Sequence, residues 1–241
     1  DNGITFVLFG NSSLIRESLE ALDSDLKKQA VLYICECRGK TKYASNNRIS
    51  YSDAFAYALN LKQADYNDIR IIPDIALAKI LSQYSKKECF IIIGSNGIST
   101  NGECAHTIGH LAITNLAQFM SRPIILISDT FKIGSLTPKP EATREGWYTT
   151  DVNYIRELDR NNIQIFCPRE DIIKISDIDY LVTEDGTFRP RDECEKINDR
   201  LKSMYKNTMR IISEIIESNP DLKDVIGQNM KDLKKDIEQL P

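Results

Sequence analysis

The chain has 241 residues, of which 41% are hydrophobic and 27% charged, a composition that is typical of globular proteins and excludes wholesale disorder. Its 31 lysines and arginines are outnumbered by 35 aspartates and glutamates, which gives a formal net charge of -4. Because general nucleic-acid binders rely on neutralising phosphates, this balance argues against direct binding of nucleic acid.

The sequence shows no membrane-spanning segment and no signal peptide. The longest apolar runs, such as residues 90–93, are far shorter than the roughly 20 residues of a membrane helix. The chain begins at Asp1 rather than Met, so we expect an excised domain or a missing N-terminal segment. Six cysteines are too few for a disulfide scaffold, and Cys35-x-Cys37 alone is not zinc spacing. We therefore expect a cytoplasmic protein with reduced thiols and no metal.

Short β-branched runs alternate with helical patterns up to about residue 190. The strand-like runs are 4–9, 30–36, 69–74, 89–93, 123–127, 163–167 and 180–183. The helical patterns are 13–22, 52–64, 77–84, 105–120 and 154–158. Apolar strands joined by helices of this length indicate a mostly parallel sheet that is covered on both faces. We therefore predict a three-layer, Rossmann-like α/β domain over residues 1–190.

After Pro190 the pattern changes to amphipathic helices, which predicts a C-terminal helical extension over residues 191–241. Apolar side chains recur about every 3.5 residues from 197 to 216, and the stripe resumes from 222 to 240 after a break at Asn219-Pro220. Such a helical hairpin packs on its own domain, on a second copy or on a different partner, and the sequence leaves these alternatives open.

The turn Gly10-Asn11-Ser12-Ser13 lies between a buried strand and a helix. Backbone N–H groups, two hydroxyls and the positive helix end make it a natural cradle for an anion, although an ordinary serine cap also explains it. Arg38 lies just past the second strand, where it either holds a phosphate or forms a surface salt bridge. Neither G-x-G-x-x-G nor a P-loop is present, so no nucleotide cofactor is predicted.

The densest turn signal, at residues 94–102, precedes the predicted helix 105–120, and its glycines either shape a loop or let the backbone approach a ligand. His106 and His110 are the two histidines of the chain, and their spacing places them on one face of that helix. No third metal ligand accompanies them. His106, near the helix N-terminus, is a candidate hydrogen-bond donor to a bound anion, with a structural role as the alternative.

Six stretches of the sequence follow one another in the order of a known family pattern. They are Leu8-Phe9-Gly10-Asn11-Ser12-Ser13, Glu36-Cys37-Arg38-Gly39, Asp74-Ile75-Ala76, Gly94-Ser95-Asn96-Gly97-Ile98 with Asn101-Gly102 and His106-Thr107-Ile108-Gly109-His110, Asp129-Thr130-Phe131-Lys132, and Val182-Thr183-Glu184-Asp185-Gly186. In this order they resemble the translation initiation factor 2B alpha, beta and delta regulatory subunits. That family is homologous to the methylthioribose-1-phosphate and ribose-1,5-bisphosphate isomerases. The resemblance covers residues 3–190.

The resemblance implies a sugar-phosphate pocket. Its ligand-binding residues in this chain would be Gly10, Asn11, Ser12, Ser13, Arg38, Asn96, Asn101, His106 and Lys132. The isomerases carry a catalytic cysteine in the first turn and a catalytic aspartate in the Gly-Ala-Asp motif, and Gly10 and Asn96 occupy these positions here. Neither residue exchanges a proton near pH 7, so we predict no catalytic residue. Thr107 replaces a family lysine, which weakens the case for a strongly anionic ligand.

The resulting hypothesis is a non-catalytic, initiation-factor-2B-like regulatory or assembly protein with a pocket that senses a sugar phosphate or a nucleotide phosphate. Family members dimerise through this domain, so the resemblance also implies a homodimer or a larger complex of related subunits. One alternative is an aldose-ketose sugar-phosphate isomerase whose proton transfers come from Cys37, Cys104 or His106. Another is a structural partner that binds no ligand.

Overall fold

The computed structural model describes residues 3–37, 53–134, 156–157, 160–163, 170–193 and 196–219. Several predictions concern residues outside these ranges: Arg38, the strand predicted at 163–167 beyond its first residue, most of the helix predicted at 154–158, and the second apolar stripe at 222–240. The structure does not test those predictions.

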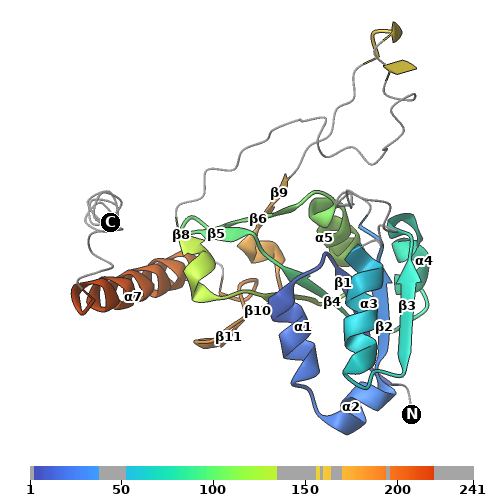
Figure 1. Cartoon of the computed structure of the whole chain (residues 1–241), viewed down its shortest axis with the longest axis horizontal. Helices are drawn as coiled ribbons and strands as arrows, with labels where there is room; N and C mark the ends of the chain where they lie inside the picture. Colours follow the sequence, from blue (N-terminus) through green and yellow to red (C-terminus); the bar gives the residue numbers. More distant parts are fainter. Residues whose placement is uncertain are drawn as a thin grey trace.

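A seven-stranded sheet runs through the centre of the described fold (Figure 1). Its strands, in the order in which they pair, are β11 (Gly186–Phe188), β10 (Tyr180–Thr183), β7 (Ile124–Ile127), β4 (Cys89–Gly94), β1 (Thr5–Phe9), β2 (Val31–Cys35) and β3 (Asp68–Ile72). All neighbouring pairs in it are parallel except the pairing of β10 with β11. The mostly parallel sheet predicted from the apolar strands is therefore confirmed.

Helices cover both faces of this sheet. Successive residues of a strand point to opposite faces, so each face forms a buried cluster of its own with the helices that cover it. In β1, Phe6 and Leu8 belong to one buried cluster, whereas Val7 and Phe9 belong to another. The first cluster includes residues of α1 (Ser13–Glu20) and α3 (Asp53–Gln63), and the second includes residues of α4 (Leu77–Leu81) and α5 (His110–Phe119). The predicted three-layer arrangement is thus confirmed. A short helix that was not predicted, α2 (Ser24–Gln29), precedes β2.

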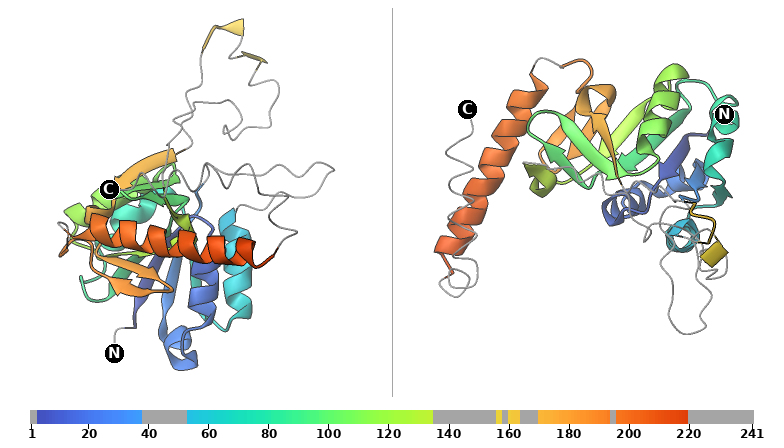
Figure 2. Two further views of the ribbon diagram at one scale, coloured as in Figure 1. Left: turned by 90° about the vertical axis from the view of Figure 1, so that its left-hand side faces the viewer. Right: turned by 90° about the horizontal axis from the view of Figure 1, so that it is seen from above.

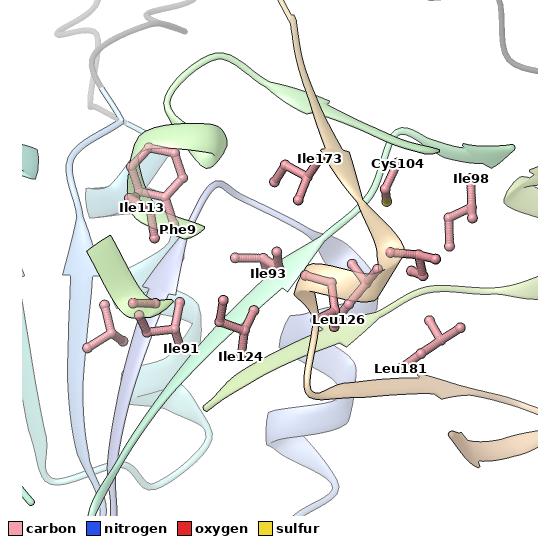
Figure 3. Close-up of a cluster of buried hydrophobic side chains, with 14 of the residues drawn as sticks. Phe9, Ile91, Ile93, Ile98, Cys104, Ile113, Ile124, Leu126, Ile173 and Leu181 are labelled. Atoms are coloured by element: carbon pink, nitrogen blue, oxygen red, sulfur yellow. The ribbon is translucent and has the colours of Figure 1, made fainter. Parts of the chain in front are cut away.

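A second sheet of four strands extends the fold beyond the Rossmann-like layer. Its strands, in pairing order, are β8 (Ile133–Gly134), β5 (Gly97–Ser99), β6 (Glu103–Thr107) and β9 (Glu170–Lys174). Figure 3 shows Ile98, Cys104 and Ile173 of this sheet beside Ile93 and Leu126 of the large sheet. The two sheets therefore share one hydrophobic core.

The helix predicted at 105–120 is wrong over its first residues. Residues 103–107 form β6, which pairs antiparallel with both β5 and β9. Gly109 then has a φ of 104°, a left-handed conformation that a continuous right-handed helix excludes, and α5 begins only at His110. Five residues are too few for periodicity to separate a helix from a strand, and here the pairing with two other strands decides it.

The C-terminal helix α7 (Ile197–Glu217) is present as predicted. It packs against β8 and against the short helix η3 (Thr130–Lys132), on the side of the small sheet. Figure 2 shows α7 running along one flank of the molecule. Its buried side chains are Ile197, Leu201, Met204, Tyr205, Thr208 and Ile216. Two further short 3-10 helices, η2 (Asp74–Ala76) and η5 (Ile175–Asp177), follow β3 and β9.

Asp171 of β9 connects the small sheet to the N-terminus of α5 through two hydrogen bonds. Its Oδ2 accepts hydrogen bonds from the backbone N–H groups of Gly109 at 2.7 Å and Leu111 at 3.0 Å. These are donors of the first helical turn, which have no acceptor within the helix itself. A carboxylate at this helix end also interacts favourably with the helix dipole.

We therefore expect Asp171→Ala to lower the free energy of unfolding by about 1–3 kcal/mol, because it leaves the partly buried N–H of Gly109 and the more exposed N–H of Leu111 without their acceptor. Asp171→Asn keeps an acceptor oxygen and should lose less. The matched control is Asp185→Ala, which removes an exposed carboxylate and should change stability by no more than about 0.5 kcal/mol. Urea unfolding measures all three, and equal losses for Asp171→Ala and Asp185→Ala would contradict the capping role.

Candidate functional site

A cavity of about 210 Å³ opens at the carboxyl ends of β1 and β4. Parallel sheets bind their ligands at this edge. The cavity is lined by Phe9, Gly10, Asn11, Ser12, Ser13, Gly94, Ser95, Asn96, Thr107, His110 and Lys132. Throughout, we call it the polar cavity. Among the lining residues that the structure describes, there is no carboxylate and no thiol.

The structure brings six of the nine predicted ligand-binding residues together in the polar cavity. They are Gly10, Asn11, Ser12, Ser13, Asn96 and Lys132. Asn101 lies instead in the exposed turn between β5 and β6. His106 is 1% exposed within β6, so it is not at a helix N-terminus and does not line the cavity. Arg38 lies outside the described residues.

The turn after β1 is built around Ser12. Ser12 is the N-cap of α1, and its Oγ accepts a hydrogen bond from the N–H of Ile15 at 3.4 Å. A Cβ on Gly94 would lie 3.1 Å from this oxygen, so the glycine at the end of β4 allows the turn to approach the strand. Ser12 therefore does act as a serine cap, and the cap holds the N-terminus of α1 against the polar cavity.

A thiol contacts the turn from the neighbouring strand. The N–H of Gly10 donates to Cys37 Sγ at 3.0 Å, and the N–H of Cys37 donates to Asp74 Oδ1 at 3.0 Å. Cys37 has a φ of 47° and lies beyond the end of β2, so it does not continue the strand that contains Cys35. Cys35 is buried, and burial raises the pKa of its thiol well above the ordinary value.

Cys37 and Asp74 line a second cavity, of about 380 Å³, whose other walls are mostly apolar. This apolar cavity lies between the end of β2, α4 and α5, and it shares Phe9 and Thr107 with the polar cavity. The thiol of Cys37 is thus next to Gly10, the position at which the resemblance places the catalytic cysteine of the isomerases, but it borders a different cavity.

Asn96, like Gly10, is contacted by a residue from another strand. Its Nδ2 donates to Glu170 Oε1 at 3.2 Å, and its N–H donates to the carbonyl oxygen of Ala105 at 2.8 Å. A carboxylate from β9 therefore contacts the residue that stands where the isomerases have their aspartate. Sequence reasoning missed Glu170 because it lies 74 residues from Asn96 and no local pattern connects the two.

The two histidines stack against each other, with ring centroids 4.7 Å apart and planes inclined by 26°. Burial, and then the neighbouring His110, lower the pKa of His106 to about 3, and the Gly94 backbone offsets this only in part. Neither ring nitrogen of His106 has a partner in good hydrogen-bond geometry. His106 is therefore an uncharged core residue at neutral pH.

His110 is one of five residues of the polar cavity that were not among the predicted ligand-binding residues; the others are Phe9, Gly94, Ser95 and Thr107. Its Nδ1 lies 2.7 Å from the carbonyl oxygen of Thr107, and its ring packs edge-on against Phe9 with centroids 4.8 Å apart. The signal in the sequence was Gly109, whose conformation ends the strand and starts the helix at His110. With Gly109 as the boundary between two elements, His106 belongs to a strand and His110 to a helix, so they do not share one helix face.

Lys132, at the end of η3, supplies a cationic side chain to the polar cavity. Its Nζ lies 3.4 Å from Asp129 Oδ2, and both side chains are 33% exposed. A pair this exposed contributes little to stability, so the lysine can turn to an incoming anion at small cost. Beneath it, the hydroxyls of Ser95 and Ser128 form a buried hydrogen bond of 2.8 Å.

The described residues offer neither a metal-binding cluster nor a membrane-spanning helix. In that part of the chain, no group of three or more His, Cys, Asp or Glu side chains is arranged to hold a metal ion. None of the helices described there combines the length and apolarity that crossing a membrane requires.

Comparison with known proteins gives a consistent result. The family model for the Initiation factor 2 subunit family matches residues 2–190. No curated protein sequence matches the chain. Solved structures show the same fold. The delta subunit of translation initiation factor eIF-2B from A. fulgidus has a TM-score of 0.57 at 15% identity, over 83% of this chain and 58% of that one.

Two further structures are similar at low identity. The 5-methylthioribose 1-phosphate isomerase of Pyrococcus horikoshii OT3 has a TM-score of 0.56 at 18% identity, over 82% of this chain and 55% of its own. A chain of the tetrameric eIF2B-beta2-delta2 complex of C. thermophilum has a TM-score of 0.51 at 13% identity, over 85% of this chain and 55% of that one. The chain thus spans somewhat more than half of each of these proteins. With the family model matching most of its length, the chain belongs to the Initiation factor 2 subunit family.

Proposed function

We propose that this protein is a non-catalytic regulatory or assembly subunit that binds a phosphorylated small molecule, such as a sugar phosphate or a nucleotide phosphate, in the polar cavity. The observation that carries the proposal is the lining of that cavity, which holds hydroxyls, an imidazole, amides and a lysine but no carboxylate or thiol among the described residues. Such a lining can bind an anion through hydrogen-bond donors, and it lacks the thiol and the carboxylate that form the acid-base pair implied by the resemblance to the isomerases.

The position of α1 supports an anionic ligand. The first turn of a helix presents N–H groups and the positive end of the helix dipole, which favour phosphate. Ser12 and Ser13 bring hydroxyls to the same place, and Lys132 supplies a positive charge from η3. These groups come from separate elements, and they converge where the strands of the parallel sheet end.

We further propose that the protein works in the cytoplasm as a homodimer or in a larger complex of related subunits. Family membership and the similarity to a subunit of a tetrameric eIF2B complex support this assembly. Sedimentation of the protein alone and with candidate partner subunits tests it.

The pocket itself is tested by thermal unfolding with sugar phosphates and nucleotide monophosphates. A ligand at about 100 times its dissociation constant adds about 2.7 kcal/mol of stability. We expect Lys132→Gln to weaken binding by at least about tenfold, because it removes a charge-assisted contact. Lys174→Gln, at the exposed end of β9, is the matched control and should bind like the parent protein. A loss that is equal in both variants, or no ligand-induced shift at all, would rule out the pocket.

A sugar-phosphate isomerase is the second candidate, because a thiol and a carboxylate contact the two positions at which the isomerases have theirs. Cys37 lies against Gly10, and Glu170 lies against Asn96. Cys104 and His106 are poorer candidates, because both are buried in β6, and burial raises the pKa of the Cys104 thiol. Among the relocated groups considered, Cys37 is therefore the one that remains.

Turnover assays with 5-methylthioribose 1-phosphate and other pentose phosphates separate the two candidates. The regulatory proposal expects no turnover. If turnover appears, Cys37→Ser and Glu170→Gln should each reduce it by about 10²-fold or more, as expected for loss of a general acid or base. Cys89→Ser, which changes a buried thiol of β4 outside both cavities, is the control and should not affect it.

A further inference from the structure

The position of Lys132 depends on a very short helix. Among the described residues that line the polar cavity, it is the only lysine or arginine. It ends η3, whose three residues supply few backbone hydrogen bonds of their own to hold it in place. Because a lysine side chain is a flexible stem, the backbone of η3 decides where its ammonium group can reach. The contacts that hold η3 therefore bear on the ligand site.

Thr130, the first residue of η3, is held by two other elements. Its N–H donates to Glu184 Oε1 at 3.0 Å and to Oε2 at 3.1 Å, and its hydroxyl donates to Oε1 as well. The same hydroxyl accepts a hydrogen bond of 3.3 Å from the hydroxyl of Thr208 in α7. Both threonines are buried. Hydrogen bonds thus run without a gap from α7, through the start of η3, to the turn between β10 and β11.

The direction of these hydrogen bonds follows from the carboxylate. An ionised carboxylate only accepts, so the Thr130 hydroxyl must donate to Glu184, and its oxygen is then the acceptor for Thr208. Partial burial acts to raise the pKa of Glu184, but hydrogen bonds, above all those from Thr130, outweigh it and lower this pKa. The carboxylate is therefore charged at neutral pH, and hydrogen bonds to a charged group are roughly twice as strong as neutral ones. Loss of the charge or of the Thr208 donor would weaken the hold on Thr130.

The α7 helix also supports the segment that follows η3. A Cβ on Gly134 of β8 would lie 3.3 Å from Cε2 of Tyr205, so helix and strand pack closely, as their positions in Figure 1 show. On the other side of η3, the hydroxyl of Ser128 bonds to Ser95 of the cavity wall at 2.8 Å. The family model ends at residue 190, whereas α7 spans Ile197–Glu217. The support from α7 therefore comes from outside the matched segment.

We propose that α7 positions Lys132 for anion binding through the hydrogen bond from Thr208 to Thr130. Thr208 and Glu184 are then positioning residues of the polar cavity, although neither lines it. This inference rests on the proposed function of the cavity, and it gives the C-terminal helix a part in that function. Without the link, the ammonium group of Lys132 spreads over more positions, and ordering it on binding costs affinity.

The experiment measures the binding of inorganic sulfate at constant ionic strength, by NMR of the backbone amides of Ser12 and Ser13 in the cavity wall. Thr208→Val has a similar shape but no donor, and it should raise the dissociation constant about three- to tenfold, the range expected for one hydrogen bond. Thr208→Ser restores the hydroxyl and should bind like the parent. Ser203→Ala, which removes an exposed hydroxyl of the same helix, is the matched control and should also bind like the parent.

A double variant distinguishes positioning from a purely structural role. In Lys132→Gln, the added change Thr208→Val should weaken binding no further, because the side chain that it positions is absent. An equal further loss there, or a lower free energy of unfolding in urea with an unchanged dissociation constant in Thr208→Val, overturns the positioning role and leaves the pocket intact.

Glu184→Gln tests the same link from an exposed position, where a substitution does not disturb the core. It should also raise the dissociation constant for sulfate, and binding like that of the parent protein overturns the positioning role. If neither sulfate nor sugar phosphates bind to the parent protein, the pocket and the positioning role are overturned together.

Discussion

As the pH falls from about 6.5 to about 4, the protein is expected to lose about 3 kcal/mol of its free energy of unfolding through His106 alone. In the folded state the pKa of this imidazole is about 3, against an ordinary value of 6.5, because its charged form is disfavoured by burial and by His110. The unfolded chain therefore takes up a proton that the folded protein does not. The stabilisation is complete above pH 6.5 and falls by about 1.4 kcal/mol per pH unit below it.

Urea unfolding of the parent and of His106→Phe at several pH values measures this contribution. Phenylalanine keeps an aromatic ring beside His110 and cannot take up a proton, so the variant should lose less stability on acidification. Asp185→Ala should follow the pH dependence of the parent closely, because it removes only an exposed carboxylate. Parallel curves for the parent and His106→Phe would show that His106 is not the group responsible.

Gly109→Ala is expected to cost about 2–5 kcal/mol of stability, from two separate causes. The residue has a φ of 104°, and a non-glycine residue pays about 1–2 kcal/mol for a left-handed conformation. In addition, the new Cβ would lie 2.7 Å from Cζ of Phe9, which is too close for a packed core and adds about 1–3 kcal/mol.

Gly186→Ala separates these two causes. Gly186 has a φ of 130°, but a Cβ there would have no neighbour within 4 Å, so only the backbone term applies. We therefore expect a smaller loss for Gly186→Ala than for Gly109→Ala in the same urea experiment. Because Phe9 lines the polar cavity, Gly109→Ala should also weaken ligand binding, whereas Gly186→Ala should not. Equal losses of stability would mean that the side chain of Phe9 moves aside without lowering the free energy of unfolding.

The large sheet was predictable because its strands are short, apolar and separated by turns. The runs at 89–93 and 180–183 correspond closely to β4 and β10, and the helix predicted at 52–64 corresponds to α3. The rule that ligands bind at the carboxyl ends of parallel strands then located the turn after β1 correctly at the edge of a cavity. Each of these inferences uses only residues that are close together in the sequence.

The small sheet and the contacts across the site were not predictable in the same way. The residues of β6 are as compatible with a helix as with a strand, and their pairing with β9 depends on a segment more than sixty residues away. The same is true of Glu170 beside Asn96, and the approach of Cys37 to Gly10 depends on how β1 and β2 pair. Such juxtapositions follow from the tertiary arrangement, for which a local pattern carries no signal.

Two adjacent residues of β9 hydrogen-bond to two elements that line the polar cavity, since Glu170 accepts from Asn96 and Asp171 accepts from N–H groups at the start of α5. A displacement of β9 would therefore move both the loop after β4 and the helix that begins at His110. Any contact that moved β9 would thus change the shape of the polar cavity from outside it, without reaching the residues that line it.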